Sequence, residues 1–100
     1  MTGEGGTAAG GPECRRTVTV VNRRGLHARA AARFVTTAEQ FVAEIEVARD
    51  SMVVCGTSIM GLMMLAAAAG SVLEIRASGR EALPAVEALA ALVANGFDEV

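Results

Sequence analysis

The sequence predicts an α+β fold, an open-faced two-layer sandwich with the element order β-α-β-β-α-β-α. In this fold a four-stranded antiparallel sheet carries three helices on one face. Three short segments alternate apolar with polar residues, as strands with one wet face do, and a fourth is a short apolar run. Three longer segments repeat apolar residues every three or four positions, as amphipathic helices do. The 100 residues are enough for a single domain.

The first quarter of the chain divides into a tail and the start of this domain. Residues 1–16 hold five of the eleven glycines and have no apolar period, so we expect a disordered tail before a domain at residues 17–100. Thr and Val alternate over residues 17–21, which predicts the first strand. A helix is predicted over residues 28–41. Its apolar stripe consists of Ala31, Phe34, Val35, Ala38 and Phe41.

The other three strands follow from local sequence patterns. Residues 43–48 and 72–77 alternate apolar with mostly charged side chains, so each strand is expected to have one buried face. Residues 52–55 are a short apolar run directly after Asp50-Ser51, a pair typical of turns.

Two more helices complete the order. Ser58 or the threonine before it can cap a helix over residues 59–69, and Gly70 is a typical signal for its end. The last helix is predicted over residues 81–94, and Asn95-Gly96 ends it. Its apolar stripe consists of Ala82, Val86, Leu89 and Val93.

Composition excludes several classes of protein. The net charge is −2, which does not indicate nucleic-acid binding. The two cysteines are too few for a disulfide framework, so we interpret Cys55 as a core residue and Cys14 as a thiol in the tail. The N-terminal segment lacks the apolar region of a signal peptide. The longest apolar run is about half the ~20 residues of a spanning helix. We therefore expect a cytoplasmic protein without membrane insertion.

His27 is the only histidine and precedes the first predicted helix. The first amides of a helix have no intrahelical partner, so a negatively charged group on His27 would meet the N–H groups of Ala28 and Arg29. Imidazole is partly unprotonated near neutral pH and can act as a nucleophile. His27 is therefore a candidate phosphoryl acceptor. The alternative is a helix cap or a surface residue.

Positive charge collects around this histidine. Residues 1–34 hold six arginines and two glutamates, a net charge of +4. Four of these arginines, which form either a functional cluster or an ordinary solvated face, are Arg23, Arg24, Arg29 and Arg33.

The helix predicted after Ser58 contains three methionines within five residues. Its expected buried stripe consists of Ile59, Leu62, Met63 and Ala66. This stripe leaves Met60 and Met64 nearer solvent. The methionines either fill an irregular core or form an adaptable apolar docking surface. Ser58 itself is a sufficient N-cap, whatever other role it has.

Two motifs carry a family resemblance. Residues 25–31 (GLHARAA) and 57–63 (TSIMGLM) resemble the histidine-containing phosphocarrier family, HPr, of the bacterial phosphoenolpyruvate-dependent phosphotransferase system. The resemblance covers about residues 17–97 and leaves out the N-terminal tail. The ending at residues 95–99 (NGFDE) is also similar to NPr, the homologue in the nitrogen-related branch of the system.

The resemblance implies a phosphocarrier rather than an enzyme. It implies that His27 is phosphorylated on Nδ1, that enzyme I supplies the phosphoryl group and that a IIA component receives it. Arg29 and the backbone amides of Ala28 and Arg29 would hold the phosphate. Ser58 matches a serine that an HPr kinase/phosphorylase modifies in some bacteria. The implied partner-binding patch beside His27 consists of Ile59, Met60 and Met63.

Ala30 departs from the family motif, which usually has proline after the arginine. Alanine should preserve the helix but leave one more N–H free. An alternative function is an NPr-like regulatory module whose phosphorylation state controls partner binding. We expect a monomer without a cofactor, and no metal site, because the chain has no second histidine and no CxxC motif.

Overall fold

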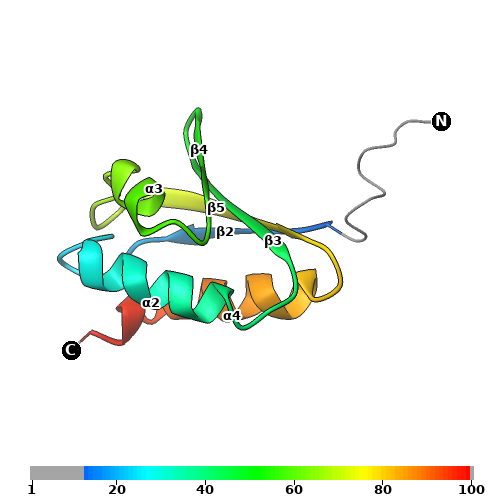
Figure 1. The fold of residues 1–100 in the computed structure, drawn as a ribbon. Coiled ribbons are helices and arrows are strands. Elements are labelled where there is room, and N and C mark those ends of the chain that lie inside the picture. Colours follow the sequence, from blue (N-terminus) through cyan, green and yellow to red (C-terminus); the bar gives the residue numbers. More distant parts are fainter. Residues whose placement is uncertain (1–12, 100) are drawn as a thin grey trace.

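The computed structural model describes residues 13–99 (Figure 1). Its secondary structure follows the predicted β-α-β-β-α-β-α order. The elements are β2 (Glu13–Thr19), α2 (Ala28–Ala38), β3 (Glu44–Arg49), β4 (Met52–Cys55), α3 (Ile59–Met64), β5 (Val72–Ser78), α4 (Ala82–Ala94) and the short 3-10 turn η1 (Gly96–Asp98).

The four strands form one sheet in the order β2-β5-β3-β4, and every neighbouring pair is antiparallel. Val47 of β3 lies opposite Ile75 of β5, and Val18 of β2 lies opposite Leu73. These positions share one face of the sheet because cross-strand partners point to the same side. The predicted antiparallel sheet is confirmed.

All three helices lie on this face. Figure 1 shows α2 and α4 side by side along the sheet. A Cβ atom on Gly61 of α3 would lie 3.2 Å from Cβ of Val54, and Val54 is opposite the buried Val47. Helix α3 therefore covers the same face at the β4 edge, and the predicted two-layer sandwich is confirmed.

The core forms where the helix stripes meet the sheet. Both stripes predicted for the long helices are buried, apart from Phe41, which lies beyond α2 and is partly buried. Phe34 of α2 and Leu89 of α4 are among the largest fully buried side chains. Phe97 of η1 is also completely buried, so the turn after α4 is part of the core.

The first strand begins earlier than predicted. Residues 13–16 belong to β2, so the expected tail boundary at residue 16 is wrong for them; residues 1–12 lie outside the described part of the chain. Cys14 pairs with Ala77 and packs against the core, so it is not an unstructured thiol. Pairing with β5 determines where this strand begins. The alternation of residues within one segment does not show which strand will pair with it, so this start could not be predicted locally.

Helix α3 ends at Met64, five residues before the predicted end. Ala66 has a left-handed φ of 51°, which breaks the helical path. Nη1 of Arg49 donates hydrogen bonds to the carbonyl oxygens of Leu65 (2.8 Å) and Ala66 (3.1 Å). Arg49 thus satisfies carbonyl groups that the end of a helix leaves free. Helix α2 is also shorter than predicted and ends at Ala38.

The shortness of α3 changes which of its side chains are buried. Leu62 is buried, but Ile59 and Met63 are 41% and 42% exposed and Ala66 is exposed, so the predicted stripe is wrong at three of four positions. Cys55 is exposed rather than in the core. It lies on the edge strand opposite Glu46, on the face of the sheet that no helix covers.

Candidate functional site

The loop before α2 is held against the segment that follows α3. The N–H of Leu26 donates to the carbonyl oxygen of Ala67 at 2.9 Å. Gly25 has a φ of +66°, and a Cβ atom there would lie 2.4 Å from the same carbonyl oxygen. Glycine is therefore required at this position for both the backbone conformation and the close approach.

His27 is the N-cap of α2, as one of the two sequence interpretations predicted. Its backbone is extended (φ −78°, ψ 178°), and its carbonyl oxygen accepts the first helical hydrogen bond from Ala31. Nδ1 of His27 accepts a hydrogen bond from the N–H of Arg29 at 3.2 Å. The N–H groups of Ala28 and Ala30 have no partner within the helix because they belong to its first turn.

The other ring nitrogen is engaged by a residue that the sequence interpretation did not select. Nε2 of His27 shares a hydrogen bond with Oε2 of Glu99. Oε1 of Glu99 accepts from the side-chain amide of Asn22 at 2.9 Å, and that amide also donates to the carbonyl oxygen of Gly25 at 2.8 Å. Asn22 is buried, so it joins the loop to Glu99 away from solvent.

These contacts define the electrostatics of the pair. The hydrogen bond from His27, with a second contribution from Asn22, lowers the pKa of Glu99 below its usual value. An ionised Glu99 accepts hydrogen bonds only, so the proton between the two side chains lies on Nε2. Nδ1 is then the ring nitrogen with a lone pair, and this lone pair faces the first turn of α2.

The C-terminal turn places Glu99 at this position. Phe97 is fully buried with a left-handed φ of 57°. Nη1 of Arg33 donates to the carbonyl oxygen of Phe97 at 2.9 Å, so α2 itself holds the turn. Spacing could not reveal this arrangement, since 72 residues separate Glu99 from His27. The only signal was the presence of Glu99 in a C-terminal motif of the family resemblance.

Three of the four predicted arginines lie beside the histidine. Arg24, Arg29 and Arg33 line a hollow of about 340 Å³ together with Asp98 and Glu99. A second hollow, of about 240 Å³, brings Arg24 next to His27 and to the backbone segment after α3. Arg23 lines neither hollow. Arg24 thus shares one hollow with His27 and another with Arg29, Arg33 and Glu99, and this positive charge near the His27–Glu99 pair favours an anion there.

Helix α3 presents apolar side chains to solvent. The exposed fractions of Met60 and Met64 are 73% and 66%, and Ile59 and Met63 are about two-fifths exposed. We call these four residues the α3 patch. Ser58 caps the helix as predicted, since its Oγ accepts from the N–H of Gly61 at 2.9 Å. Ala67 follows the α3 patch by three residues, and its carbonyl oxygen accepts a hydrogen bond from Leu26, next to His27. The α3 patch and His27 therefore lie at the same end of the molecule.

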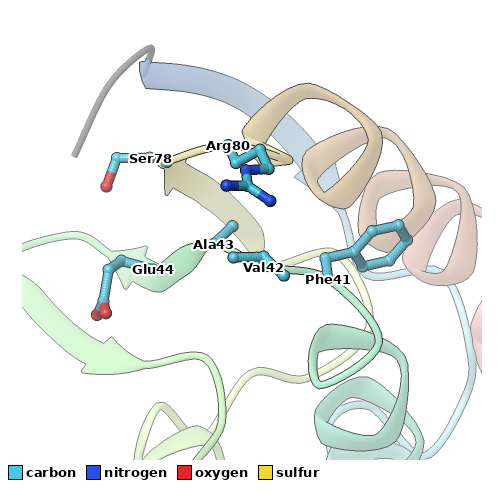
Figure 2. A pocket seen from close by; sticks show the side chains of 7 residues that line it. Phe41, Val42, Ala43, Glu44, Ser78 and Arg80 are labelled. Carbon is cyan, nitrogen blue, oxygen red and sulfur yellow. The ribbon is translucent and has the colours of Figure 1, made fainter.

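A hollow of about 620 Å³ lies at the opposite end of the sheet, where Glu44 pairs with Ser78. Figure 2 shows its lining, with the Arg80 guanidinium group above Val42 and Ala43. It contains none of the predicted site residues, and we therefore place the functional site at His27. Among residues 13–99, no three His, Cys, Asp or Glu side chains could hold a metal ion together, and no helix is long and apolar enough to cross a membrane.

Comparison with known proteins connects this geometry to a family. The family model for the phosphorylation site of the PTS HPr component matches residues 14–95. Phosphocarrier protein HPr of Neisseria meningitidis serogroup A is 44% identical over 85 residues, which are 85% of this chain and 96% of that protein. The chain belongs to the HPr family. It is a phosphocarrier of the phosphotransferase system, not an enzyme, and the resemblance predicted from its two motifs is confirmed.

Other HPr-family proteins agree with the fold. A crystal structure of HPr from Thermoanaerobacter tengcongensis matches with a TM-score of 0.83 and 39% identity, over 87% of this chain and 98% of that chain. Phosphocarrier protein NPr of Shewanella violacea is 38% identical over 84% of this chain and 92% of that protein. A second structure from the Thermoanaerobacter species is described as an HPr dimer, so the expected monomeric state stays a prediction.

Proposed function

We propose that His27 carries the phosphoryl group of this phosphocarrier on Nδ1, receiving it from enzyme I and passing it to a IIA component. The observation that supports this proposal most directly is the orientation of the ring. Nε2 holds the proton toward Glu99, while Nδ1 faces the N–H of Arg29. Nδ1 is thus the nucleophilic atom, and it lies at a helix N-terminus, where an anion is stabilised.

The transfer step needs no movement of a proton. The lone pair of Nδ1 forms the bond to phosphorus as the bond between phosphorus and the donor breaks, and that electron pair returns to the donor. The proton on Nε2 stays in place, so the ring gains positive charge. In the onward step a nucleophile of the IIA component forms a bond to phosphorus as the P–N bond breaks, and the electron pair of the P–N bond returns to Nδ1.

The first turn of α2 supplies groups for the phosphoryl oxygens. When Nδ1 becomes bonded to phosphorus, the N–H of Arg29 loses its acceptor and can donate to a phosphoryl oxygen instead. The N–H of Ala28 is free within the helix for the same purpose. The guanidinium group of Arg29 adds positive charge on this side, in a hollow that it shares with Arg24 and Arg33.

We further propose that enzyme I and the IIA component dock on the α3 patch. An exposed apolar surface of this kind is typical of a protein interface, and methionine side chains adapt to partners of different shape. Ser58 lies at the start of the patch, within reach of an HPr kinase/phosphorylase in organisms that have one. We expect the chain to act as a cytoplasmic monomer, which size-exclusion chromatography with light scattering would test.

Phosphorylation in vitro tests the phosphate site. Incubation with phosphoenolpyruvate and enzyme I should produce acid-labile, alkali-stable phosphate on the parent and none on His27→Ala. Circular dichroism should show that the variant is folded, since His27 is outside the core. Acid-labile phosphate on His27→Ala would overturn the proposal.

Arg29→Glu tests the arginine in the same assay. Transfer should slow at least tenfold because a negative charge replaces a positive one beside the phosphoryl group. Arg80→Glu makes the same exchange in the distant hollow of Figure 2 and serves as the control. Equal rates for the two variants would remove Arg29 from the mechanism.

A regulatory module that controls partner binding is the second candidate function. The relative named NPr and the similar ending at residues 95–99 favour it. Rapid passage of phosphate to a sugar-specific IIA component would support the carrier role in sugar uptake. A stable phosphorylated form that changes binding to a regulator would support the second candidate.

A further inference from the structure

We propose that Glu99 is a positioning residue for phosphoryl transfer: its carboxylate holds the proton of His27 on Nε2 and stabilises the positive charge that the ring acquires when Nδ1 binds phosphorus. The inference rests on the proposed phosphorylation of His27. The inference goes beyond that proposal because it assigns a role to the C-terminal turn, which lies outside the motifs around His27 and Ser58.

The first argument is the geometry of the pair. Both Glu99 and His27 are mostly shielded from solvent, with side chains 21% and 15% exposed. A hydrogen bond between a carboxylate and a ring that becomes charged is stronger than one between neutral groups, and limited solvent exposure reduces screening. Glu99 therefore favours the phosphorylated, cationic ring over the neutral one.

The second argument is that the structure fixes Glu99 from two sides. The Asn22 amide holds its second oxygen, and Asn22 is itself held by the carbonyl oxygen of Gly25. On the chain side, the fully buried Phe97 and the hydrogen bond from Arg33 fix the turn two residues before Glu99. The carboxylate is thus held in place before any phosphoryl group arrives, and this lowers the cost of orienting it.

The third argument concerns the other charges around the pair. Arg24, Arg29 and Arg33 line one hollow together with Glu99 and Asp98. The segment after α3 contributes alanines on the other side of His27. Among the acidic residues lining these two hollows, only Glu99 bonds to the ring, because Asp98 is directed toward Arg33 at 4.0 Å. Asp98 is therefore a suitable control.

The test compares Glu99→Gln with Asp98→Asn, two changes that each remove one negative charge from adjacent positions. In the phosphoenolpyruvate and enzyme I assay, Glu99→Gln should lower the equilibrium constant for phosphorylation of His27, measured from the phosphorylated fraction, about fivefold to tenfold, the difference between a charged and a neutral hydrogen bond. Asp98→Asn should keep the parental fraction. Glu99→Asp, which keeps the carboxylate, should recover part of the loss.

The pH profile separates positioning from a merely structural role. Because the carboxylate stabilises the cationic phosphorylated ring, the pH profile of the phosphoryl-transfer rate for Glu99→Gln should move toward lower pH. In the unphosphorylated parent, ¹⁵N NMR should show the proton on Nε2. An unchanged profile and equilibrium in Glu99→Gln, or equal losses in Asp98→Asn, would overturn the inference. Absence of phosphohistidine in the parent would instead overturn the proposed function.

Discussion

At the scale of single residues, the two nitrogens of His27 have different partners, and this difference determines what each can do. Nδ1 faces the first amides of α2, whereas Nε2 faces a carboxylate. A neutral imidazole has one donor and one acceptor, so the partner of one nitrogen decides the state of the other. The chemistry of the site therefore depends on two contacts, one from the first turn of α2 and one from the C-terminal turn.

Ala30 provides a prediction at this scale. It occupies the first turn of α2, where a missing N–H costs no helical hydrogen bond. Ala30→Pro should raise the free energy of unfolding by about 0.4–1 kcal/mol, because proline restricts the unfolded chain. Thermal denaturation should show a higher Tm. Since Ala30 is fully buried, an unchanged or lower Tm would mean that the ring does not fit.

Glu99 predicts a pH-dependent contribution to stability. Its pKa is lower in the folded protein than the usual value of 4.5 because of its bond to His27 and then to Asn22. A lowered carboxyl pKa stabilises the fold above pH 4.5, and this contribution disappears as the pH falls through the folded pKa. Urea unfolding should therefore show that the parent exceeds Glu99→Gln in stability at pH 6 and loses that advantage progressively as the pH falls below 4.5 and through the folded pKa. A constant difference across this range would contradict the prediction.

At the scale of elements, α3 combines a weak helix with an exposed surface. It has six residues, buries only Leu62, and depends on Ser58 at its start and on Arg49 at its end. A helix this short is not stable alone, so the burial of Leu62 and the two terminal contacts hold it in place, and none of these uses the α3 patch. Its apolar residues are therefore available to partners.

Ser58→Asp tests whether a negative charge at Ser58, such as a kinase would add, weakens docking on this helix. Aspartate is a good N-cap and favours the helix dipole by about 0.3–1 kcal/mol, so the Tm should be unchanged or higher. Phosphoryl transfer from enzyme I should slow, since a charge beside the α3 patch must lose water on docking. Ser78→Asp, at the far end of the sheet, is the matched control. Transfer at the parental rate over a range of enzyme I concentrations would leave Ser58 as a cap alone.

The elements also show what can be predicted from sequence. The stripe of α4 was predicted correctly because thirteen residues display a full helical period. The buried stripe predicted for α3 was wrong because the helix ends early. Its end is held by Arg49, from another part of the chain, which donates to the carbonyl oxygen of Leu65. The position of His27 followed from local signals at a helix start. Its contact with Glu99 did not, since only the folded chain brings the two together.

At the scale of the whole molecule, charge is distributed unevenly over an acidic protein. Three of the six arginines in the first third of the chain, Arg24, Arg29 and Arg33, line hollows at the His27 end, although the net charge is −2. The exposed face of the sheet instead carries alternating charges, where Arg76 bonds to Glu74 at 2.6 Å and approaches Glu46 at 3.8 Å. The His27 end is thus the region most suited to an acidic partner.

This arrangement predicts a salt effect. The rate of association with an acidic partner should fall as ionic strength rises, because exposed charges are screened over about 10 Å at 0.1 M salt. Stopped-flow measurements from 0.05 to about 0.5 M NaCl would show this trend. Arg24→Gln should flatten the salt dependence, and Arg80→Gln should leave it unchanged. A rate independent of salt would contradict the prediction.

The contact between Glu99 and His27 has a practical consequence for experiments with tagged protein. Strand β2 starts at the end of the molecule away from the start of α2, whereas the turn η1 lies close to that start (Figure 1). An affinity tag or fluorescent protein fused behind Glu99 would emerge next to the imidazole and could pull the carboxylate away from it. A fusion placed before Glu13 would emerge at the far end. Kinetic comparisons should therefore use N-terminal fusions, and a difference in phosphorylation between the two designs would itself report on the C-terminal turn.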